Sequence, residues 1–486
     1  MNKISCFLPY AGKEQVEKTV NSLQATGLIE EIRLITTDAT LESLPDCEIL
    51  FVDMPYSSAT LKAIANAAKG EYTLLYTKET TLEMGMFALE RMIHILEDSS
   101  AGMVYADHYQ IADGKQSNAP VIDYQFGSLR DDFNFGSLLL FNTEKLKEAA
   151  GHMKSDYNFA GLYDLRLKLS QHSNLVHINE YLYSEVENDT RKSGEKIFDY
   201  VDPKNHDRQI EMEQACTEHL KEIGGYLAPE FKKIEFSAGN FEYEASVIIP
   251  VRNRIRTIRD AIKSVLMQKT DFKYNLIIID NHSTDGTTEA IDEFKDDERL
   301  IHIVPERNDL GIGGCWNVGV HHPKCGKFAV QLDSDDVYKD ENTLAIMVRA
   351  FYEQNCAMVV GTYMMTDFNM NMIAPGIIDH KEWTPANGRN NALRINGLGA
   401  PRAFYTPVLR EVKVPNTSYG EDYALGLNFS RQYQIGRVYD VVYLCRRWDD
   451  NSDASLDIVK MNGHNLYKDR IRTWELQARI AMNKNK

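Results

Sequence analysis

Cysteine and long apolar runs are scarce in this sequence, and both shortages restrict the kinds of protein it can be. Seven cysteines occur among 486 residues, and an odd number at irregular spacing is not typical of a disulfide framework. No apolar run approaches the roughly 18 residues that a membrane-spanning helix requires. The apolar stretch at residues 4–9 is too short for a secretory signal. We therefore expect a protein of the cytoplasm with reduced cysteines.

Basic residues are also fewer than acidic residues. The chain has 54 lysines and arginines against 71 aspartates and glutamates, which gives a formal net charge of −17. A field of this sign repels phosphate backbones, so nucleic acid is not an expected partner. Hydrophobic residues make up 43% and charged residues 26%, a balance typical of a folded globular chain. At about 150 residues per domain, the length predicts two to four domains.

The two halves of the chain repeat one plan. An apolar strand, an amphipathic helix and a second strand are expected within residues 5–35, and the same order returns within residues 246–279. Two later pairs of segments also match, 70–76 with 326–332 and 136–148 with 399–411. Continuous apolar strands separated by helices are typical of βαβ units and a mainly parallel sheet. The alternative is that any two α/β domains look broadly alike.

The repeat predicts an α/β fold of two tandem Rossmann-like domains, each with a mainly parallel sheet. We place the first domain at residues 1–225 and the second at 244–486, with a C-terminal helix included in the second. The segment 226–243 is expected to be the linker, since glycine and proline mark its beginning.

In the second half, polar segments follow the predicted strands. Ligands of open parallel sheets bind outside the carboxyl ends of the strands, so these segments are candidates for binding. They contain Pro250, Arg252 and Asn253 after the first strand, Asp280, Asn281 and Asp285 after the second, and Gly311 in a glycine-rich loop. Asp280 or Asn281 could recognise a base or ribose, and Asp285 could cap the next helix. Backbone amides of the glycine-rich loop could approach a phosphate.

The segment Asp333-Ser334-Asp335-Asp336 ends an apolar strand. Its three carboxylates repel one another unless a cation or water screens them. Mg²⁺ and Mn²⁺ take oxygen ligands and are readily shared between carboxylates and a diphosphate. The segment is therefore a candidate metal site, or alternatively an acidic turn that caps the helix expected near residue 341.

Two further segments carry charge toward the C-terminus. Glu421 and Asp422 begin a predicted helix, where acidic residues usually match the helix dipole, although one carboxylate could instead accept a proton from an acceptor hydroxyl. Arg446 and Arg447 follow an apolar strand and could neutralise a leaving diphosphate, while Trp448 could stack on a sugar.

Taken in this order, the segments resemble the family 2 inverting glycosyltransferases, which have a GT-A fold. Residues 280–286 are similar to the family's D-[DN]-x-S-T-D-G turn, Asp333-Ser334-Asp335 to its DxD motif, and Glu421-Asp422 to its ED motif. The resemblance implies that Asp280 and Asn281 contact the base and ribose and that Asp333 contacts the ribose or the metal. It further implies that Asp335 binds the metal, with Ser334 and Asp336 close by on the nucleotide-sugar. It also implies that Asp422 is the general base and that Glu421 lies on the acceptor side.

The function implied by the resemblance is transfer of a sugar, with inversion, from a nucleotide-diphosphate donor to a hydroxyl. The acceptor would be a glycan or a lipid-linked sugar in surface polysaccharide assembly. Asn281 stands where many members carry an aspartate that binds uracil, so the resemblance does not imply a UDP donor. Arg446-Arg447-Trp448 replaces the QxxRW motif of processive members and places Trp448 where many others carry histidine, so chain-extending processivity is not expected. One alternative is a sugar nucleotidyltransferase, but the segment after the first strand lacks its glycine-rich loop. The other is a non-catalytic carbohydrate-binding or scaffolding protein.

The first half lacks these motifs. Residues 77–80, Thr-Lys-Glu-Thr, align with the acidic segment, and only Glu79 keeps a charge that suits a metal. Gly161 and Leu162 align with the ED pair, and leucine cannot accept a proton. We therefore predict a catalytically inactive copy, retained for packing, for acceptor binding or for a homodimer.

The C-terminal stretch is helical in pattern and rich in basic residues, namely Lys468, Arg470, Arg472, Arg479, Lys484 and Lys486. It could make a peripheral contact with an anionic membrane. The favoured interpretation is a helix that packs on the protein through Ile471, Trp474 and Ala478.

Overall fold

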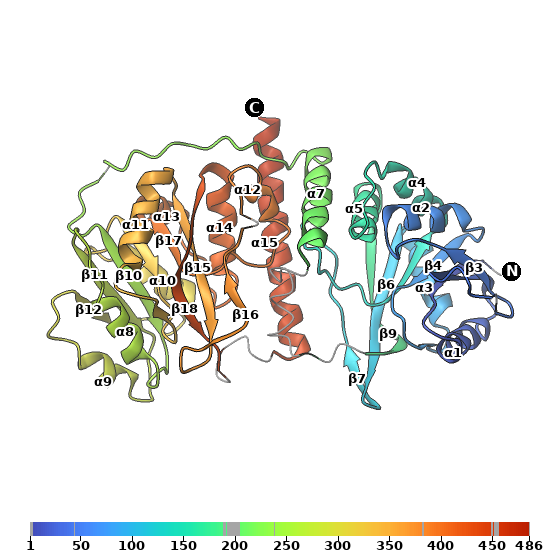
Figure 1. Cartoon of the computed structure of the whole chain (residues 1–486), viewed down its shortest axis with the longest axis horizontal. Helices are drawn as coiled ribbons and strands as arrows, with labels where there is room; N and C mark the ends of the chain where they lie inside the picture. The colour runs from blue at the N-terminus through green and yellow to red at the C-terminus, as the bar shows by residue number, and fades with distance from the viewer. Residues whose placement is uncertain are drawn as a thin grey trace. The chain divides into compact units, whose positions relative to one another are not determined.

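Continuous apolar strands form the centre of both units into which the chain divides (Figure 1). The structure is a computed structural model that describes residues 3–42, 44–187, 191, 205–237, 239–381, 383–448, 451 and 456–485. Unit 1 comprises Met1–Gly225 and Ser455–Leu476, and unit 2 comprises Tyr226–Ala454 and Gln477–Lys486.

The sheet of unit 1 has nine strands in the order β3-β2-β1-β4-β8-β6-β9-β5, and β7 pairs with β6. The strands are β1 (Ile4–Pro9), β2 (Ile29–Thr36), β3 (Glu48–Phe51), β4 (Tyr72–Tyr76), β5 (Leu82–Met84), β6 (Met103–Ala112), β7 (Lys115–Ala119), β8 (Leu138–Asn142) and β9 (Leu175–Val186). The helices are α1 (Lys13–Gln24), α2 (Ser58–Ala67), α3 (Ala88–Asp98), α4 (Thr143–His152), α5 (Gly161–His172) and α7 (His206–Glu222).

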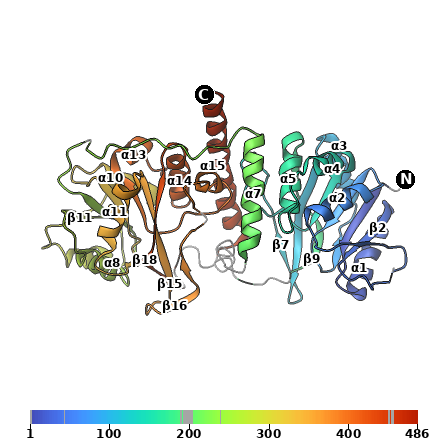
Figure 2. The ribbon, with the colours of Figure 1, turned by 45° about the horizontal axis from the view of Figure 1, so that its top comes forward.

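Strand β1 is buried along its whole length because helices cover both faces of the sheet (Figure 2). Ile4, Cys6 and Leu8 point to one face and pack with buried residues of α1 and α3. Phe7 points to the other face and packs with residues of α2, α4 and α5. The alternation of side chains along one strand therefore builds two cores, one on each side of the sheet.

The sheet of unit 2 has the corresponding order β12-β11-β10-β13-β17-β15-β18-β14, and β16 pairs with β15. The strands are β10 (Ala245–Val251), β11 (Tyr274–Asp280), β12 (Leu300–Ile303), β13 (Phe328–Gln331), β14 (Val337–Tyr338), β15 (Met358–Thr366), β16 (Met372–Ile378), β17 (Arg402–Tyr405) and β18 (Ile435–Arg446). The helices are α8 (Ile258–Leu266), α9 (Thr287–Asp292), α10 (Ile312–His321), α11 (Thr343–Gln354), α12 (Gly388–Asn391), α13 (Thr406–Val412) and α14 (Glu421–Gln432).

The α/β fold predicted from the sequence is confirmed. Strands β10, β11, β12 and β13 pair in parallel, and β17 runs antiparallel to β13. The expected strand, helix and strand of residues 246–279 are β10, α8 and β11. All seven cysteines are free thiols, as their number and spacing predicted. Among the described residues, no helix combines the length and the apolar composition needed to cross a bilayer.

The segment predicted as a linker packs on unit 2 instead. Leu227 and Ile234 are buried, and their backbone amides donate to the side chains of Asn390 (2.9 Å) and Asn355 (3.0 Å). The sequence suggested a linker because glycine and proline open the segment, but its two buried apolar residues fix it to the domain that follows.

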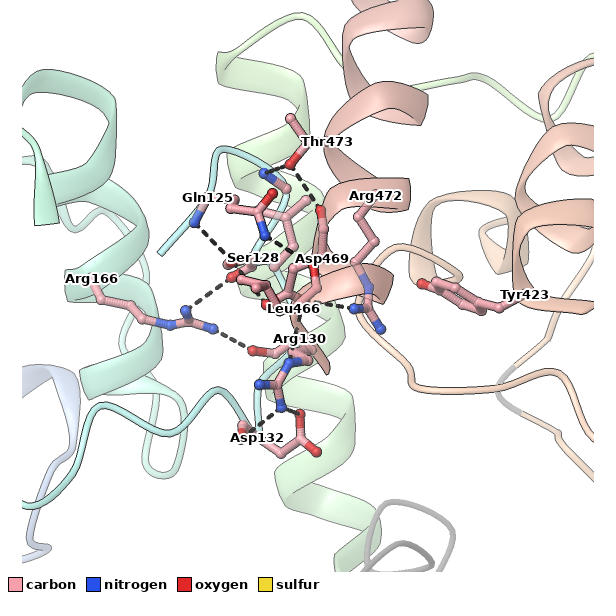
Figure 3. A network of polar contacts seen from close by, with 12 residues as sticks. Gln125, Ser128, Arg130, Asp132, Arg166, Tyr423, Leu466, Asp469, Arg472 and Thr473 are labelled. Carbon is pink, nitrogen blue, oxygen red and sulfur yellow. Dashed lines mark hydrogen bonds and ion pairs between the residues drawn. The ribbon is translucent and has the colours of Figure 1, made fainter. Parts of the chain in front are cut away.

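The C-terminal helix α15 (Ile458–Lys484) does not belong to the second domain alone, as the sequence analysis expected, because Ser455–Leu476 cluster with unit 1. Figure 3 shows why. The Asp469 carboxylate is fully buried and lies 3.0 Å from the Ser128 hydroxyl, 3.3 Å from Arg130 Nε and 2.8 Å from Arg472 Nη1. Gly127 N also donates to the Thr473 hydroxyl at 2.9 Å. These contacts join the helix to the 125–130 segment of unit 1.

The favoured expectation that this helix packs on the protein is confirmed for Ile471, which is buried, but Trp474 is 56% exposed. Among the basic residues, Lys468, Arg472 and Arg479 are buried, while Arg470 and Lys484 are exposed. Lys486 lies outside the described residues. The helix therefore offers an anionic membrane few of the charges that the sequence suggested.

Candidate functional site

The segments expected to bind ligand leave the same edge of the sheet of unit 2. Strands β10 and β11 run in parallel with Val251 opposite Asp280, and β13 runs parallel to β10 with Gln331 opposite Ile248. The carboxyl ends of these three strands therefore lead into residues 252–256, 281–286 and 332–336. This edge is where ligands bind in open α/β sheets.

The turn after β11 is held by Asp280. Its buried carboxylate accepts hydrogen bonds from Ser283 N (3.0 Å) and the Thr288 hydroxyl (2.5 Å). Burial alone would raise the pKa of Asp280, but the contacts with His302, Ser283 and Thr288 outweigh it and hold this pKa well below its ordinary value. Asn281 donates from Nδ2 to Leu310 O at 2.8 Å, and its buried Oδ1 has no hydrogen-bond partner among the residues that the structure describes. Asp280 is therefore an ionised group that shapes the turn.

The turn after β10 interlocks with the turn after β11. Asn253 has a positive φ of 54°, and its Oδ1 accepts a hydrogen bond from Thr284 N at 2.8 Å. Asp285 accepts from Ile255 N (3.1 Å) and from Thr287 N (3.0 Å) at the start of α9. The N-cap of α9 is Gly286, so Asp285 lies one residue before the capping position that the sequence suggested and binds the first backbone amide of the helix. Pro250 is half-buried within β10, and Arg252 is exposed beyond it.

The glycine-rich loop at the start of α10 faces the protein's own backbone. Gly311 N donates to Asn416 Oδ1 at 2.8 Å, and a Cβ added to Gly311 would lie 2.7 Å from the Thr417 carbonyl carbon. Gly313 N donates to Thr417 O at 2.9 Å. The sequence analysis expected this loop to approach a phosphate, whereas the structure explains its glycines by the close approach of residues 415–417.

The acidic segment after β13 is pinned by neighbouring strands. Asp333 accepts from Gln331 Nε2 (2.8 Å), and its backbone amide donates to the Tyr443 hydroxyl (3.1 Å). Asp336 is buried and accepts from Arg446 N at 2.8 Å, while Ser334 is almost fully buried. Asp335 Oδ2 lies 3.4 Å from Asn451 Nδ2 and 3.7 Å from Arg254 Nε, and its side chain is 16% exposed.

Burial and repulsion among the acidic groups raise the pKa values of Asp333 and Asp336. Burial, together with the charges of Asp335 and Asp422, raises the pKa of Asp333, although Arg402 and Gln331 act in the opposite direction. Burial, with the charges of Asp335 and Asp333, raises the pKa of Asp336 well above its ordinary value. A divalent cation held by Asp333 and Asp335 would relieve this repulsion, so the donor set fits Mg²⁺ or Mn²⁺. Among the described residues, no three metal-binding side chains already surround one point.

Glu421 and Asp422 form the first turn of α14. Asp422 Oδ2 lies 2.8 Å from Arg402 Nη1, at the start of β17, and Asp422 Oδ1 accepts from Tyr423 N at 2.7 Å. Burial and the neighbouring charge of Asp422 raise the pKa of Glu421 to about 8. Because the charge of Asp422 also acts on Asp333, the ED turn and the acidic segment belong to one electrostatic environment.

The two arginines at the end of β18, Arg446 and Arg447, differ in their exposure. Arg446 is 1% exposed, and its guanidinium donates to Asp335 O (2.5 Å) and lies 2.9 Å from Asp260 Oδ2. The sequence analysis expected Arg446 to meet a leaving diphosphate, but the structure shows that it braces the acidic segment. Arg447 and Trp448 directly follow β18, and both are half-buried. The guanidinium carbon of Arg256 lies 4.9 Å from the centroid of the Trp448 ring, and the Phe368 ring lies 5.6 Å from the Trp448 ring at an angle of 56°.

Arg402 is the main site residue that the sequence analysis missed. It lies 14% exposed between the ED turn and the acidic segment, and Asp422 and Asp333 raise its pKa although burial opposes them. Its backbone amide also donates to Gln331 Oε1 at 3.1 Å. An isolated arginine at the start of an otherwise apolar strand, Arg-Ala-Phe-Tyr, is the signal that could have identified it.

The geometry of unit 2 is that of an open α/β domain that binds its ligand at the carboxyl ends of the strands. At this edge lie the acidic segment 333–336, the Glu421-Asp422 turn at the start of α14, and Arg402 between them. Residues 246–403 match the sequence model of glycosyl transferase family 2.

Similar proteins cover parts of the chain. An uncharacterized glycosyltransferase of Rickettsia felis is 37% identical over 198 residues, 40% of this chain and 31% of the relative. A putative teichuronic acid biosynthesis glycosyltransferase of Bacillus subtilis, TuaG, is 29% identical over 126 residues, 26% of this chain and 49% of the relative. The chain therefore spans less than half the length of either relative. Among solved structures, residues 1–349 of TarS from S. aureus with UDP-GlcNAc are 18% identical, with a TM-score of 0.38 over 49% of this chain and 72% of that chain.

Proposed function

We propose that unit 2 transfers a sugar from a nucleotide-diphosphate donor to a hydroxyl group, with inversion at the anomeric carbon. The observation that carries the proposal is a chain of contacts from the acidic segment to Asp422. Gln331 Nε2 donates to Asp333 at 2.8 Å, Arg402 N donates to Gln331 Oε1 at 3.1 Å, and Arg402 Nη1 lies 2.8 Å from Asp422 Oδ2. A donor-side acidic segment and a candidate proton acceptor thus share one electrostatic environment. The acceptor is proposed to be a glycan or lipid-linked sugar, in keeping with a relative assigned to teichuronic acid biosynthesis.

In the proposed reaction the acceptor oxygen bonds to the anomeric carbon on the face opposite the leaving diphosphate. Asp422 accepts the proton of that hydroxyl, and Arg402 orients Asp422 through their 2.8 Å contact. Asp333 and Asp335 would hold Mg²⁺ or Mn²⁺, which when bound neutralises charge on the diphosphate. Asn281 and the turn shaped by Asp280 lie at the edge where the base and ribose would bind. Glu421 and Trp448 are proposed to face the acceptor.

We propose further that unit 1 is an inactive copy of the same fold. Two observations support this proposal. The two sheets share one strand order, and Lys78, which aligns with Ser334, lies 2.6 Å from Glu185 and 3.0 Å from Glu187. The Lys78 ammonium thus lies in the part of unit 1 that corresponds to the acidic segment of unit 2. Leu162 stands where unit 2 has Asp422 and has no group that could accept a proton.

Thermal shift of the full chain tests the donor and the metal together. Nucleoside diphosphates and nucleotide-sugars are screened with and without Mn²⁺. A ligand at 100 times its dissociation constant stabilises the folded protein by about 2.7 kcal/mol, so a donor raises the unfolding temperature measurably. We expect one nucleotide to do so only with Mn²⁺, and the Asp335→Asn variant to lose the effect. The exposed Asp296→Asn variant is the matched control. Stabilisation by no nucleotide would favour the scaffolding alternative.

A further inference from the structure

Unit 1 contains a cavity of about 260 Å³ that the proposed transfer does not use. It lies between the N-terminal half of α5, helix α7, the 131–135 segment, and strands β6 and β8. Its floor is made of buried apolar side chains, among them Met103, Phe133, Leu139, Phe141 and Leu165. A cavity of about 150 Å³ with such a lining holds a benzene molecule, so this one has room for a ring with substituents.

Three polar side chains of the lining are hydrogen-bonded within unit 1, and the lining also includes one carboxylate, that of Asp131. The Tyr56 hydroxyl donates to Thr77 O (3.0 Å), and the Tyr163 hydroxyl donates to Leu129 O (2.5 Å). The Arg166 guanidinium donates to Ser128 O (3.1 Å) and Arg130 O (2.5 Å), as Figure 3 shows. A sugar ring needs several hydrogen-bond partners along its edge. The floor therefore suits an apolar ring or a short hydrocarbon chain better than a sugar.

The mouth of the cavity has a different character. Arg208 at the start of α7, together with Asn158 and Phe159 before α5, lines the cavity and is exposed. Phe159 is 42% exposed, which places a large apolar side chain at the rim. A guanidinium and an amide beside an apolar floor can bind the anionic head of a ligand whose body is apolar.

The rim is fixed in place by Glu211. Its carboxylate accepts hydrogen bonds from the backbone amides of Asn158 (3.1 Å), Phe159 (2.6 Å) and Ala160 (3.1 Å). This contact ties helix α7 to the segment before α5, on either side of the mouth. A cavity that is already formed costs less ordering when a ligand enters.

We infer that this cavity binds a small amphipathic anion, with an apolar ring or chain on the floor and a carboxylate, phosphate or sulfonate at Arg208 and Asn158. Leu162 lines the cavity at the position that aligns with Asp422 of unit 2. Unit 1 would therefore have a ligand site at the end of its fold that corresponds to the candidate site of unit 2. At this position unit 1 would bind an apolar group, whereas unit 2 would transfer a proton. The inference rests on unit 1 alone and does not depend on transferase activity.

Calorimetric titration of the full chain with phenyl phosphate tests the inference. We expect saturable binding of one molecule per chain. Inorganic phosphate lacks the ring, and burial of an aromatic ring is worth a factor of about ten or more. Benzyl alcohol lacks the anion, and a hydrogen bond to a charged group is worth about the same factor, so each is expected to bind at least about tenfold more weakly. Absence of saturable binding, or equal binding of inorganic phosphate, would overturn the proposal.

Two variants locate the binding. Arg208→Gln is expected to weaken phenyl phosphate about tenfold while leaving benzyl alcohol unchanged, and Arg470→Gln, an exposed arginine of α15, is the matched control. Leu162→Trp fills the cavity and is expected to abolish binding, with its folding checked by thermal unfolding. Because Arg208 is exposed, its substitution does not endanger folding, so unchanged binding in Arg208→Gln would by itself contradict the proposal.

Discussion

Arg402 links the two acidic parts of the candidate site at the scale of single residues. It is largely buried, contacts the Asp422 carboxylate at 2.8 Å and also acts on Asp333. A cation in this position favours the ionised form of a carboxylate that has to accept a proton. Arg402 is therefore expected to position and ionise the proposed base without touching the substrate.

The Arg402→Gln variant tests this role through the pH dependence of sugar transfer. Removing the cation makes Asp422 easier to protonate, so the acid limb of the kcat profile is expected to move to higher pH. The exposed Arg349→Gln variant of α11 is the matched control. A loss of activity that is uniform across pH, with the limb unmoved, would mean that Arg402 has only a structural role.

His219 makes the stability of unit 1 depend on pH. Burial, with the nearby charge of Lys168, lowers the pKa of His219 to about 3. The unfolded chain, whose histidine has a pKa near 6.5, therefore binds more protons below that pH, and stability is lost as pH falls from about 6.5 toward 3. Between pH 7 and 5.5 this one group is expected to remove about 1 kcal/mol from the free energy of unfolding.

Urea unfolding at pH 7 and 5.5 measures this dependence. The His219→Gln variant is expected to show a pH-dependent loss about 1 kcal/mol smaller than the parent chain. His94 is exposed, and His94→Gln should reproduce the parent's loss. If His219→Gln kept the full loss, another group would be responsible.

At the scale of elements, a charge cluster in unit 1 joins the segment after β4 to β9. Glu185 is 1% exposed and contacts Lys78 (2.6 Å) and His108 (3.3 Å). Although burial opposes it, contacts with His108 and Lys78 lower the pKa of Glu185 to about 2. The cluster joins the end of β4 to β9 by ionic contacts within the chain.

The Lys78→Met variant measures how much this cluster contributes. Removing one partner of a largely buried ion pair leaves the other charge without compensation, and we expect unit 1 to lose about 2–3 kcal/mol of unfolding free energy. Lys115→Met, at an exposed position of β7, should cost far less. Equal effects of the two substitutions in urea unfolding would show that the ion pair contributes little.

At the scale of the whole molecule, the sequence predicted the order of elements more fully than it predicted contacts. The run of β10, α8 and β11 could be read from apolar periodicity and turn residues, because each of these patterns is local. The bracing of the acidic segment by Arg446 could not, since Arg446 and Asp335 are 111 residues apart. The division of α15 between the two units depends on Asp469, whose partner Ser128 is 341 residues away. Such pairs leave no periodic signal.

The central claim is that proton transfer belongs to unit 2 and is absent from unit 1. Sugar transfer by the full chain is measured for Asp422→Asn and Glu79→Gln, with the exposed Asp440→Asn as the matched control for the first. We expect Asp422→Asn to lower kcat by at least about a hundredfold, as the loss of a general base does, while nucleotide binding persists. Glu79→Gln and Asp440→Asn should leave kcat unchanged. Intact transfer in Asp422→Asn together with loss in Glu79→Gln would contradict the account.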